Sequence, residues 1–312
     1  MPRRLNVALC LLAFVFAGCK PSYPKKDLIG SVRDLFRKEL GVEVDTQLSG
    51  RTIYVAFEIE KLVTKNLELP KDATDKLESA MLSISRIALS TDADIKYTVI
   101  EANDFALGIR IELVRKMQDL KDLFYWKISK PDFDERLILE VVKISDDYGR
   151  SAVSSAPSRG AADVFAGEKS LWHDLSLPEF MGRLVASRIN MGVRTNPFLS
   201  ILLGVEKVIP RFDEDGKTLY LAVESYSKPK GVADSSIAMD FLSDTIKEQM
   251  SRIGAKYEDP EWAKSVVVQD LDGRALLEIK RDDWINAGEK HAGNVIRNIK
   301  IRSENKTVND RR

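Results

Sequence analysis

Two nine-residue stretches decide the fold: Gly50–Glu58 reads GRTIYVAFE, and Gly216–Glu224 reads GKTLYLAVE. They match position for position in residue type. Each is rich in β-branched and aromatic residues and opens with a glycine, which is typical of a strand that leaves a tight turn. A match at this separation indicates an internal repeat, so the chain is expected to contain two copies of one unit.

The residues after each stretch also run in parallel. A helix is expected after Pro70, because apolar residues recur there at helical spacing. A second apolar stripe, ended by Gly254, predicts the corresponding helix of the second copy. The first stripe comprises Ala73, Leu77, Ala80, Met81, Ile84, Ile87 and Ala88, and the second Met239, Leu242, Ile246, Met250 and Ile253.

A strand before each stretch and a hairpin after each helix complete the pattern. The first hairpin is expected to turn at Asn103-Asp104, and the second at 270–273. A helix precedes each copy: one covers 28–40, and the other begins after Ser176, with Glu179 completing a capping box. A helix and a strand close each copy, at 116–127 and 137–144, then at 282–291 and 295–302.

The predicted fold class is therefore α+β, with two similar α-β-β-α-β-β-α-β halves and antiparallel sheets. The first unit is expected at 27–145 and the second at 176–302. Residues 146–175 form a linker or long loop, because they are rich in Ser, Ala and Gly. The polar end, 303–312, is expected to be a flexible tail.

The N-terminus has the features of a targeting signal. Arg3 and Arg4 precede an apolar run from Leu5 to Phe16, too short to span a bilayer, which makes residues 1–18 a predicted signal peptide. The motif Phe16-Ala17-Gly18-Cys19 resembles the lipobox of bacterial lipoproteins, with Phe16 where that class prefers Leu. The resemblance covers only this leader.

The resemblance implies cleavage between Gly18 and Cys19, lipidation of Cys19, and a tether at 19–26. It also implies a bacterial cell envelope location. Lys20 stands where an Asp would, in enteric bacteria, signal inner-membrane retention, so the outer membrane facing the periplasm is favoured weakly over the inner membrane.

Composition and motif content exclude several classes of partner and chemistry. Lys+Arg and Asp+Glu are both 48, so no basic excess suggests a nucleic acid partner. The other cysteine, Cys10, lies in the leader, which excludes a thiol nucleophile in the mature chain. The two histidines, His173 and His291, have no ligand-spaced neighbour, and the common hydrolase and nucleotide-binding motifs are absent.

No catalytic residue, metal site or cofactor is therefore predicted, and the chain leans away from being an enzyme. His173-Asp174 could imitate a base and its orienting carboxylate, but a loop histidine beside a helix start is the preferred interpretation. Enzymes that use carboxylate or serine chemistry remain an alternative, as does a solute-binding lipoprotein.

Two apolar features could form a partner surface. The run 198–203 reads as a short apolar helix, in which Phe198, Leu199 and Leu202 are the possible partner-binding residues. A buried helix is the preferred interpretation of this run, because helices that are apolar all round are usually interior. The cluster Phe124-Tyr125-Trp126 is expected in a core, although Tyr and Trp are also favoured at interfaces. The predicted function is a lipid-anchored, non-catalytic binding or assembly adaptor with an envelope protein partner.

Overall fold

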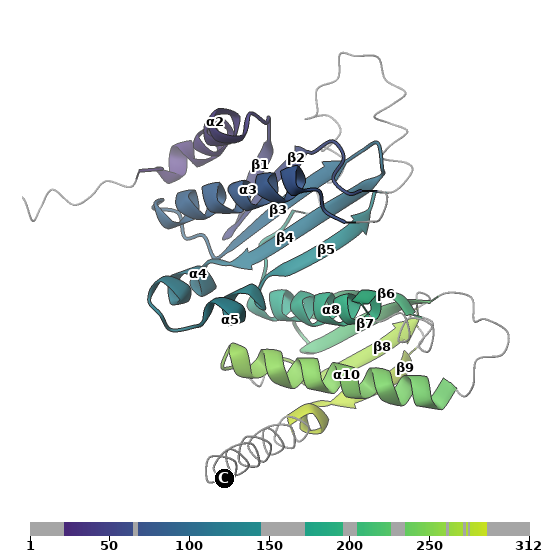
Figure 1. Cartoon of the computed structure of the whole chain (residues 1–312). Helices are drawn as coiled ribbons and strands as arrows, with labels where there is room; N and C mark the ends of the chain where they lie inside the picture. The colour runs from purple at the N-terminus through teal and green to yellow at the C-terminus, as the bar shows by residue number, and fades with distance from the viewer. Residues whose placement is uncertain are drawn as a thin grey trace, which may run out of the picture. The chain divides into compact units, whose positions relative to one another are not determined.

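The chain divides into two compact units, Met1–Asp174 and Leu175–Arg312 (Figure 1). In this computed structural model the described residues are 22–64, 68–144, 172–195, 205–225, 235–259, 262–270, 273 and 275–285. The fold class is α+β with two similar halves, as predicted from the repeat.

Unit 1 follows the predicted order of helices and strands. It begins with a short 3-10 helix, η1 (Lys25–Asp27), and adds one short helix outside the repeated pattern, α5. The remaining elements are α2 (Leu28–Leu40), β1 (Asp45–Ser49), β2 (Thr52–Glu58), α3 (Lys71–Leu89), β3 (Tyr97–Asp104), β4 (Ile109–Lys116), α4 (Met117–Phe124), α5 (Lys130–Asp134) and β5 (Ile138–Lys143).

The sheet of unit 1 has the order β1-β2-β3-β4-β5. Its hairpins are antiparallel, but β2 and β3 run parallel, with Thr52 opposite Tyr97 and Glu58 opposite Asn103. The expectation of purely antiparallel sheets is therefore wrong for this pair. The reason is that α3 lies between β2 and β3 in the chain, and a helical crossover returns the chain to the same end of the sheet.

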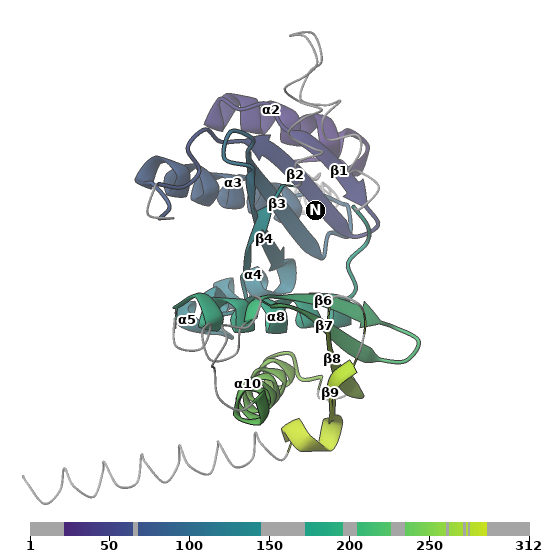
Figure 2. The ribbon, with the colours of Figure 1, turned by 90° about the vertical axis from the view of Figure 1, so that its right-hand side faces the viewer.

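The core of unit 1 lies between the sheet and its helices. Alternate residues of β2, namely Ile53, Val55 and Phe57, face the helices, and Ile84 and Ile87 of α3 pack in the same cluster. Together, α2, α3 and α4 cover this face of the sheet (Figure 2). The helices stand on one side because their apolar stripes must be buried against one apolar sheet face.

The first hairpin turns two residues later than expected. Asn103 and Asp104 are buried in β3, and the turn is formed by residues 105–108. The carboxylate of Asp104 accepts hydrogen bonds from the backbone N–H groups of Leu107 and Leu62, at 2.9 Å each. Asp104 thus works as a turn residue from inside the strand.

Unit 2 repeats the arrangement with a four-stranded sheet, in the order β6-β7-β8-β9. The central pair, β7 and β8, is again parallel, and α10 connects its two strands. The elements are α8 (Leu177–Thr195), β6 (Val205–Asp213), β7 (Thr218–Ser225), α10 (Ser235–Lys256), β8 (Ser265–Asp270) and β9 (Ala275–Lys280).

Helix α8 packs closely on the sheet of unit 2. A Cβ at Gly182 would lie 2.8 Å from the side chain of Leu219, so the small residue permits this approach. Asn190 of α8 holds β6, because its side-chain amide donates to the Val208 carbonyl (2.9 Å) and accepts from the Val208 N–H (2.7 Å). One half of the predicted capping box is present, with the Ser176 hydroxyl accepting from the N–H of Glu179 (3.3 Å).

Several expectations fall outside the described residues. These are the signal peptide and lipobox, most of the linker, the last strand at 295–302 and the tail. No helix among the described residues is long and apolar enough to cross a membrane.

Candidate functional site

An apolar groove opens on the helical side of unit 1. It lies between α3 on one side and α4 and α5 on the other, and it has a volume of about 1170 Å³. Leu113 of β4 and Leu139 of β5 line it from the sheet. The other apolar lining residues are Leu69, Leu77, Met81, Leu82, Leu89, Leu120, Leu123, Phe124, Phe133 and Leu137.

The wall formed by α3 has a second apolar stripe beside the one that enters the core. Leu77 is buried, but Leu82 is 73% exposed and Leu89 is 37% exposed. Lining residues run from Thr74 to Leu89, which spans about 22 Å at 1.5 Å per residue. The wall is therefore long enough to receive about four turns of another helix.

The opposite rim ends in an aromatic tip, formed by Phe124, Tyr125 and Trp126. These side chains are 63%, 72% and 91% exposed, so the expectation that the cluster lies in a core is wrong. The physical reason is that α4 ends at Phe124, and the chain turns outward before α5 begins. Three adjacent exposed aromatics are unusual on a water-facing surface and point to an interaction site.

The turn that carries the tip has a defined geometry. The Lys127 N–H donates to the Asp122 carbonyl (2.8 Å), and the Trp126 N–H donates to the Leu123 carbonyl (3.1 Å). This is a Schellman ending, in which the penultimate position needs a left-handed backbone and is usually glycine. Here Trp126 occupies that position with φ of 58°, so a bulky residue is held in a costly conformation.

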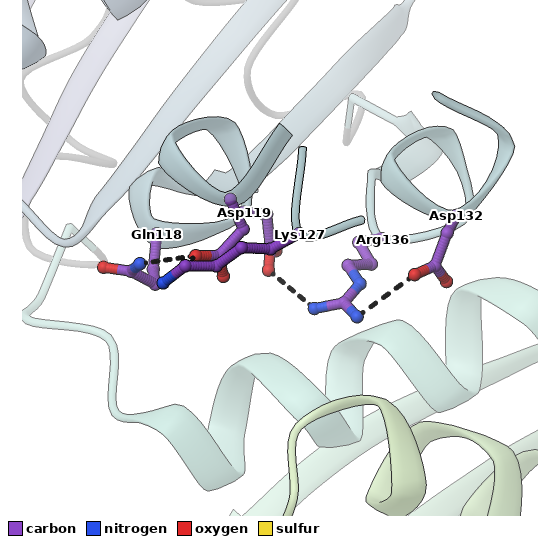
Figure 3. Close-up of polar contacts among 6 residues, drawn as sticks. Gln118, Asp119, Lys127, Asp132 and Arg136 are labelled. Atoms are coloured by element: carbon purple, nitrogen blue, oxygen red, sulfur yellow. Dashed lines mark hydrogen bonds and ion pairs between the residues drawn. The ribbon is translucent and has the colours of Figure 1, made fainter. Parts of the chain in front are cut away.

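Polar contacts beneath the tip fix α4 against α5 (Figure 3). The Arg136 guanidinium donates to Asp119 (3.1 Å) and to Asp132 (3.3 Å), and both Asp119 and Arg136 are buried. On the outer side, Lys127 forms an ion pair with Asp122 (3.5 Å), and Gln118 donates to the same carboxylate (2.8 Å).

Lys116 lies at the start of α4, and its environment is desolvated. Burial lowers the pKa of Lys116, while the nearby carboxylate of Asp119 acts in the opposite direction. The start of α4 therefore lies beside buried charged groups, whereas its end is apolar and exposed.

Several charged groups along the groove form ion pairs. Glu39 of α2 accepts from Arg86 of α3 (2.5 and 2.6 Å) and from Ser83 (2.9 Å). These contacts, led by the hydrogen bond from Arg86, hold the pKa of Glu39 below its usual range, and the hydrogen bond to Glu39 raises the pKa of Arg86. On the other side Lys130 contacts Asp134.

Inside the groove, the Arg115 guanidinium lies 3.7 Å from the ring centroid of Phe133. This cation–π contact packs the Arg115 side chain against the lining of the groove. The groove therefore presents an apolar interior with charges confined to its edges or stacked on a ring.

A second polar cluster lies on the other face of the unit 1 sheet. Trp172 stacks on Tyr54 (5.2 Å between ring centroids) and donates from Nε1 to Glu101 (3.0 Å), whose other oxygen lies 3.5 Å from Arg110. The hydroxyl of Tyr54 donates to the His173 carbonyl (2.8 Å). This cluster attaches the segment 172–174 to the sheet.

Asp174 closes the turn before β2. Its carboxylate accepts from the backbone N–H of Arg51 (2.8 Å), and a Cβ at Gly50 would lie 2.3 Å from Asp174. Asp174 therefore binds the repeat motif itself, and the suggested base-and-carboxylate pair with His173 has a structural explanation instead.

The residues singled out from sequence as sites lie outside the described part of the chain. This holds for Gly18 and Cys19 of the lipobox and for Phe198, Leu199 and Leu202. Within the described ranges, no group of three or more His, Cys, Asp or Glu side chains could hold a metal ion.

Sequence reasoning missed the groove. Leu82 was the available signal, because it is a large apolar residue that lies off the buried stripe of α3. A helix with one apolar stripe in the core and further leucines outside it has a second contact face to cover.

No family model, curated protein or solved structure matches this chain.

Proposed function

We propose that this chain is a lipid-anchored bacterial envelope protein that acts as a non-catalytic adaptor, and that its groove binds an amphipathic helix of an envelope protein partner. Cleavage between Gly18 and Cys19 would leave Cys19 to carry the lipid, with the outer membrane favoured for delivery. The observation that carries the binding role is the exposed apolar groove of unit 1, bordered by Leu82 and the aromatic tip.

The rim favours a protein over a small solute. Leu82 and Phe124 project at the edges of the groove and are largely exposed. A small ligand in the interior would leave both in water, whereas a helix seated along the 22 Å wall would cover them. Burial of each such side chain contributes roughly 1.5–3 kcal/mol, so a large occupant gains most.

The edge charges fit an amphipathic helix. Glu39 and Arg86 stand on one side and Lys130 and Asp134 on the other, so the edges are polar and nearly neutral while the interior is apolar. A partner helix with apolar residues at i, i+3, i+4 and i+7 would match this pattern.

The binding test uses a photo-reactive amino acid at Leu82 in living cells. We expect a cross-link to one envelope protein, mapping to an amphipathic helix of that partner. The matched control places the same group at Leu107, which is 51% exposed in the β3–β4 turn. Equal cross-linking from both positions, or none from Leu82, would count against the groove.

A second variant separates binding from folding. Leu82→Asp should abolish capture of the same partner while leaving the melting temperature nearly unchanged, because the side chain is already exposed. If capture persists with Leu82→Asp, the groove is not the binding site. A rise in melting temperature with a small ligand, and no captured partner, would favour a solute-binding lipoprotein.

The anchor has its own test. Cys19→Ala should move the protein from the membrane to the soluble envelope fraction and abolish incorporation of radiolabelled lipid. Retention of the variant in the membrane fraction would refute the proposed anchor.

A further inference from the structure

We infer that the aromatic tip enters the interface of the bilayer that holds the lipid on Cys19, so that the membrane contacts unit 1 at a second point. The inference rests on the anchor proposed above, and it specifies which end of unit 1 faces the bilayer. Tyr125 and Trp126 are the contacting residues, because they project from the tip without lining the groove.

Only a short segment, from Cys19 to Tyr23 and called the leash here, separates the proposed lipid from the first contact with unit 1. The Tyr23 N–H donates to the Ser90 carbonyl (3.3 Å), and the Lys25 N–H donates to Asp92 (2.5 Å), so the chain is already fastened to the end of α3 at Tyr23. Cys19 precedes Tyr23 by four Cα–Cα steps, which reach at most about 14 Å. A lipid on Cys19 would therefore keep this part of unit 1 close to the bilayer.

The tip lies at the same end of unit 1 as that leash. The crossover from β2 through α3 brings the end of α3 to the start of β3, and antiparallel β4 returns to this same edge. Here the Met117 N–H, which opens α4, donates to the Lys96 carbonyl (2.8 Å). Figure 1 shows the start of α2 and the α4–α5 turn at this common end.

The side chains suit a headgroup layer. Trp and Tyr are favoured at membrane–water interfaces because one end of each ring system is apolar and the other can hydrogen-bond. Exposed Lys25 and Lys26 near Tyr23 and Lys121 and Lys127 beside the tip can meet anionic headgroups. Lys26 and Lys127 also have acidic neighbours, Asp27 at 3.9 Å and Asp122 at 3.5 Å.

Hydrogen bonds fix the backbone of the tip. The Schellman hydrogen bonds and the buried Asp119–Arg136 pair hold its backbone, and Trp126 keeps a strained φ that glycine would adopt more easily. A bulky, exposed and strained residue indicates selection for contact with something outside the fold.

Tryptophan fluorescence can test this directly, because the chain has four tryptophans and three of them are buried. Trp172, Trp262 and Trp284 are at most 7% exposed, so Trp126 dominates the accessible emission. The full chain, purified from membranes, would be reconstituted into phosphatidylethanolamine–phosphatidylglycerol vesicles with brominated acyl chains. We expect quenching and a blue shift in the wild type, and loss of both in Trp126→Phe.

A matched control reports the opposite end of the sheet. Leu107→Trp in the Trp126→Phe background places an exposed tryptophan in the turn after the far end of β3, a strand whose seven steps span about 23 Å. Emission from this variant should be unaffected by the bromines.

The outcomes separate the two proposals. Failure of the chain to float with vesicles refutes the anchor, and this inference with it. Flotation without quenching of Trp126, or with equal quenching of Leu107→Trp, refutes the inference and leaves the anchor standing. A blue shift without quenching would mean that protein covers the tip, which also overturns the inference.

Discussion

At the residue scale, Trp126 combines two costs that folding alone does not explain. It is 91% exposed, and its φ of 58° lies in the left-handed region. A non-glycine residue pays about 1–2 kcal/mol for that conformation. Both costs make sense if the side chain contacts a partner or a bilayer.

Trp126→Gly is therefore expected to stabilise the protein. Relief of backbone strain should exceed the roughly 0.5–1 kcal/mol that glycine loses in entropy, which leaves a gain of up to about 1.5 kcal/mol in the free energy of urea unfolding. The Trp126→Gly variant should also lose the proposed contact of this side chain with a partner or a bilayer. The control is Tyr125→Gly, whose native φ of −90° needs no glycine and which should destabilise. Destabilisation of equal size by both variants would refute the strain argument.

Arg136→Met tests the buried pair beneath the tip. The substitution leaves Asp119 buried without its guanidinium partner, and it should cost about 3–5 kcal/mol in the free energy of unfolding. Adding Asp119→Leu should recover much of that loss. Lys127→Met, at an exposed ion pair, should change stability by less than about 1 kcal/mol. A small effect of Arg136→Met would show that the pair is not needed to hold α4 against α5.

At the element scale, α3 carries two apolar faces, of which one is buried in the core and the other lines the groove. The stripe predicted from sequence packs in the core, where Ala73, Ile84 and Ile87 are buried. Periodicity found this stripe because burial repeats with the helical turn. The face that contains Leu82 was not recognised, because only the positions of α4 and α5 turn it into a groove wall.

The stability contributed by the Glu39–Arg86 ion pair, which joins α2 to α3, is expected to depend on pH. Because the pKa of Glu39 is lowered from its ordinary value of 4.5, its contribution is complete above pH 4.5 and is lost as pH falls through the lowered value. Glu39→Gln should cost about 0.2–1 kcal/mol at neutral pH, typical of exposed pairs. In chemical unfolding followed from pH 7 to pH 3, the difference from the wild type should shrink; a constant difference would exclude this linkage.

At the whole-molecule scale, the chain consists of two compact units with the same central arrangement. The repeat motif forms the first strand of each parallel pair, β2 in one unit and β7 in the other. The segment 172–174, expected within a linker, packs on the sheet of unit 1 through Trp172 and Asp174.

We expect two separable unfolding transitions in calorimetry. Arg136→Met should lower one of them, and Asn190→Ala, which removes both bonds to Val208 in unit 2, should lower the other. The second loss should be about 1–3 kcal/mol, because it leaves buried backbone groups without their partner. A single transition lowered by either variant would show that the chain unfolds as one cooperative body.

The sequence by itself determined the fold class, the order of the elements in the described parts of both units, and the helix face that enters the core. These features are local or periodic, so the spacing of apolar residues and turn signals reveals them. The lipid anchor is also a prediction from local sequence.

Only the tertiary structure decided the parallel pairing of β2 with β3, the exposure of Phe124, Tyr125 and Trp126, and the groove beside Leu82. Each depends on where separate segments meet in space. An aromatic cluster reads the same in sequence whether the chain turns it into a core or out into solvent, and packing alone distinguishes the two.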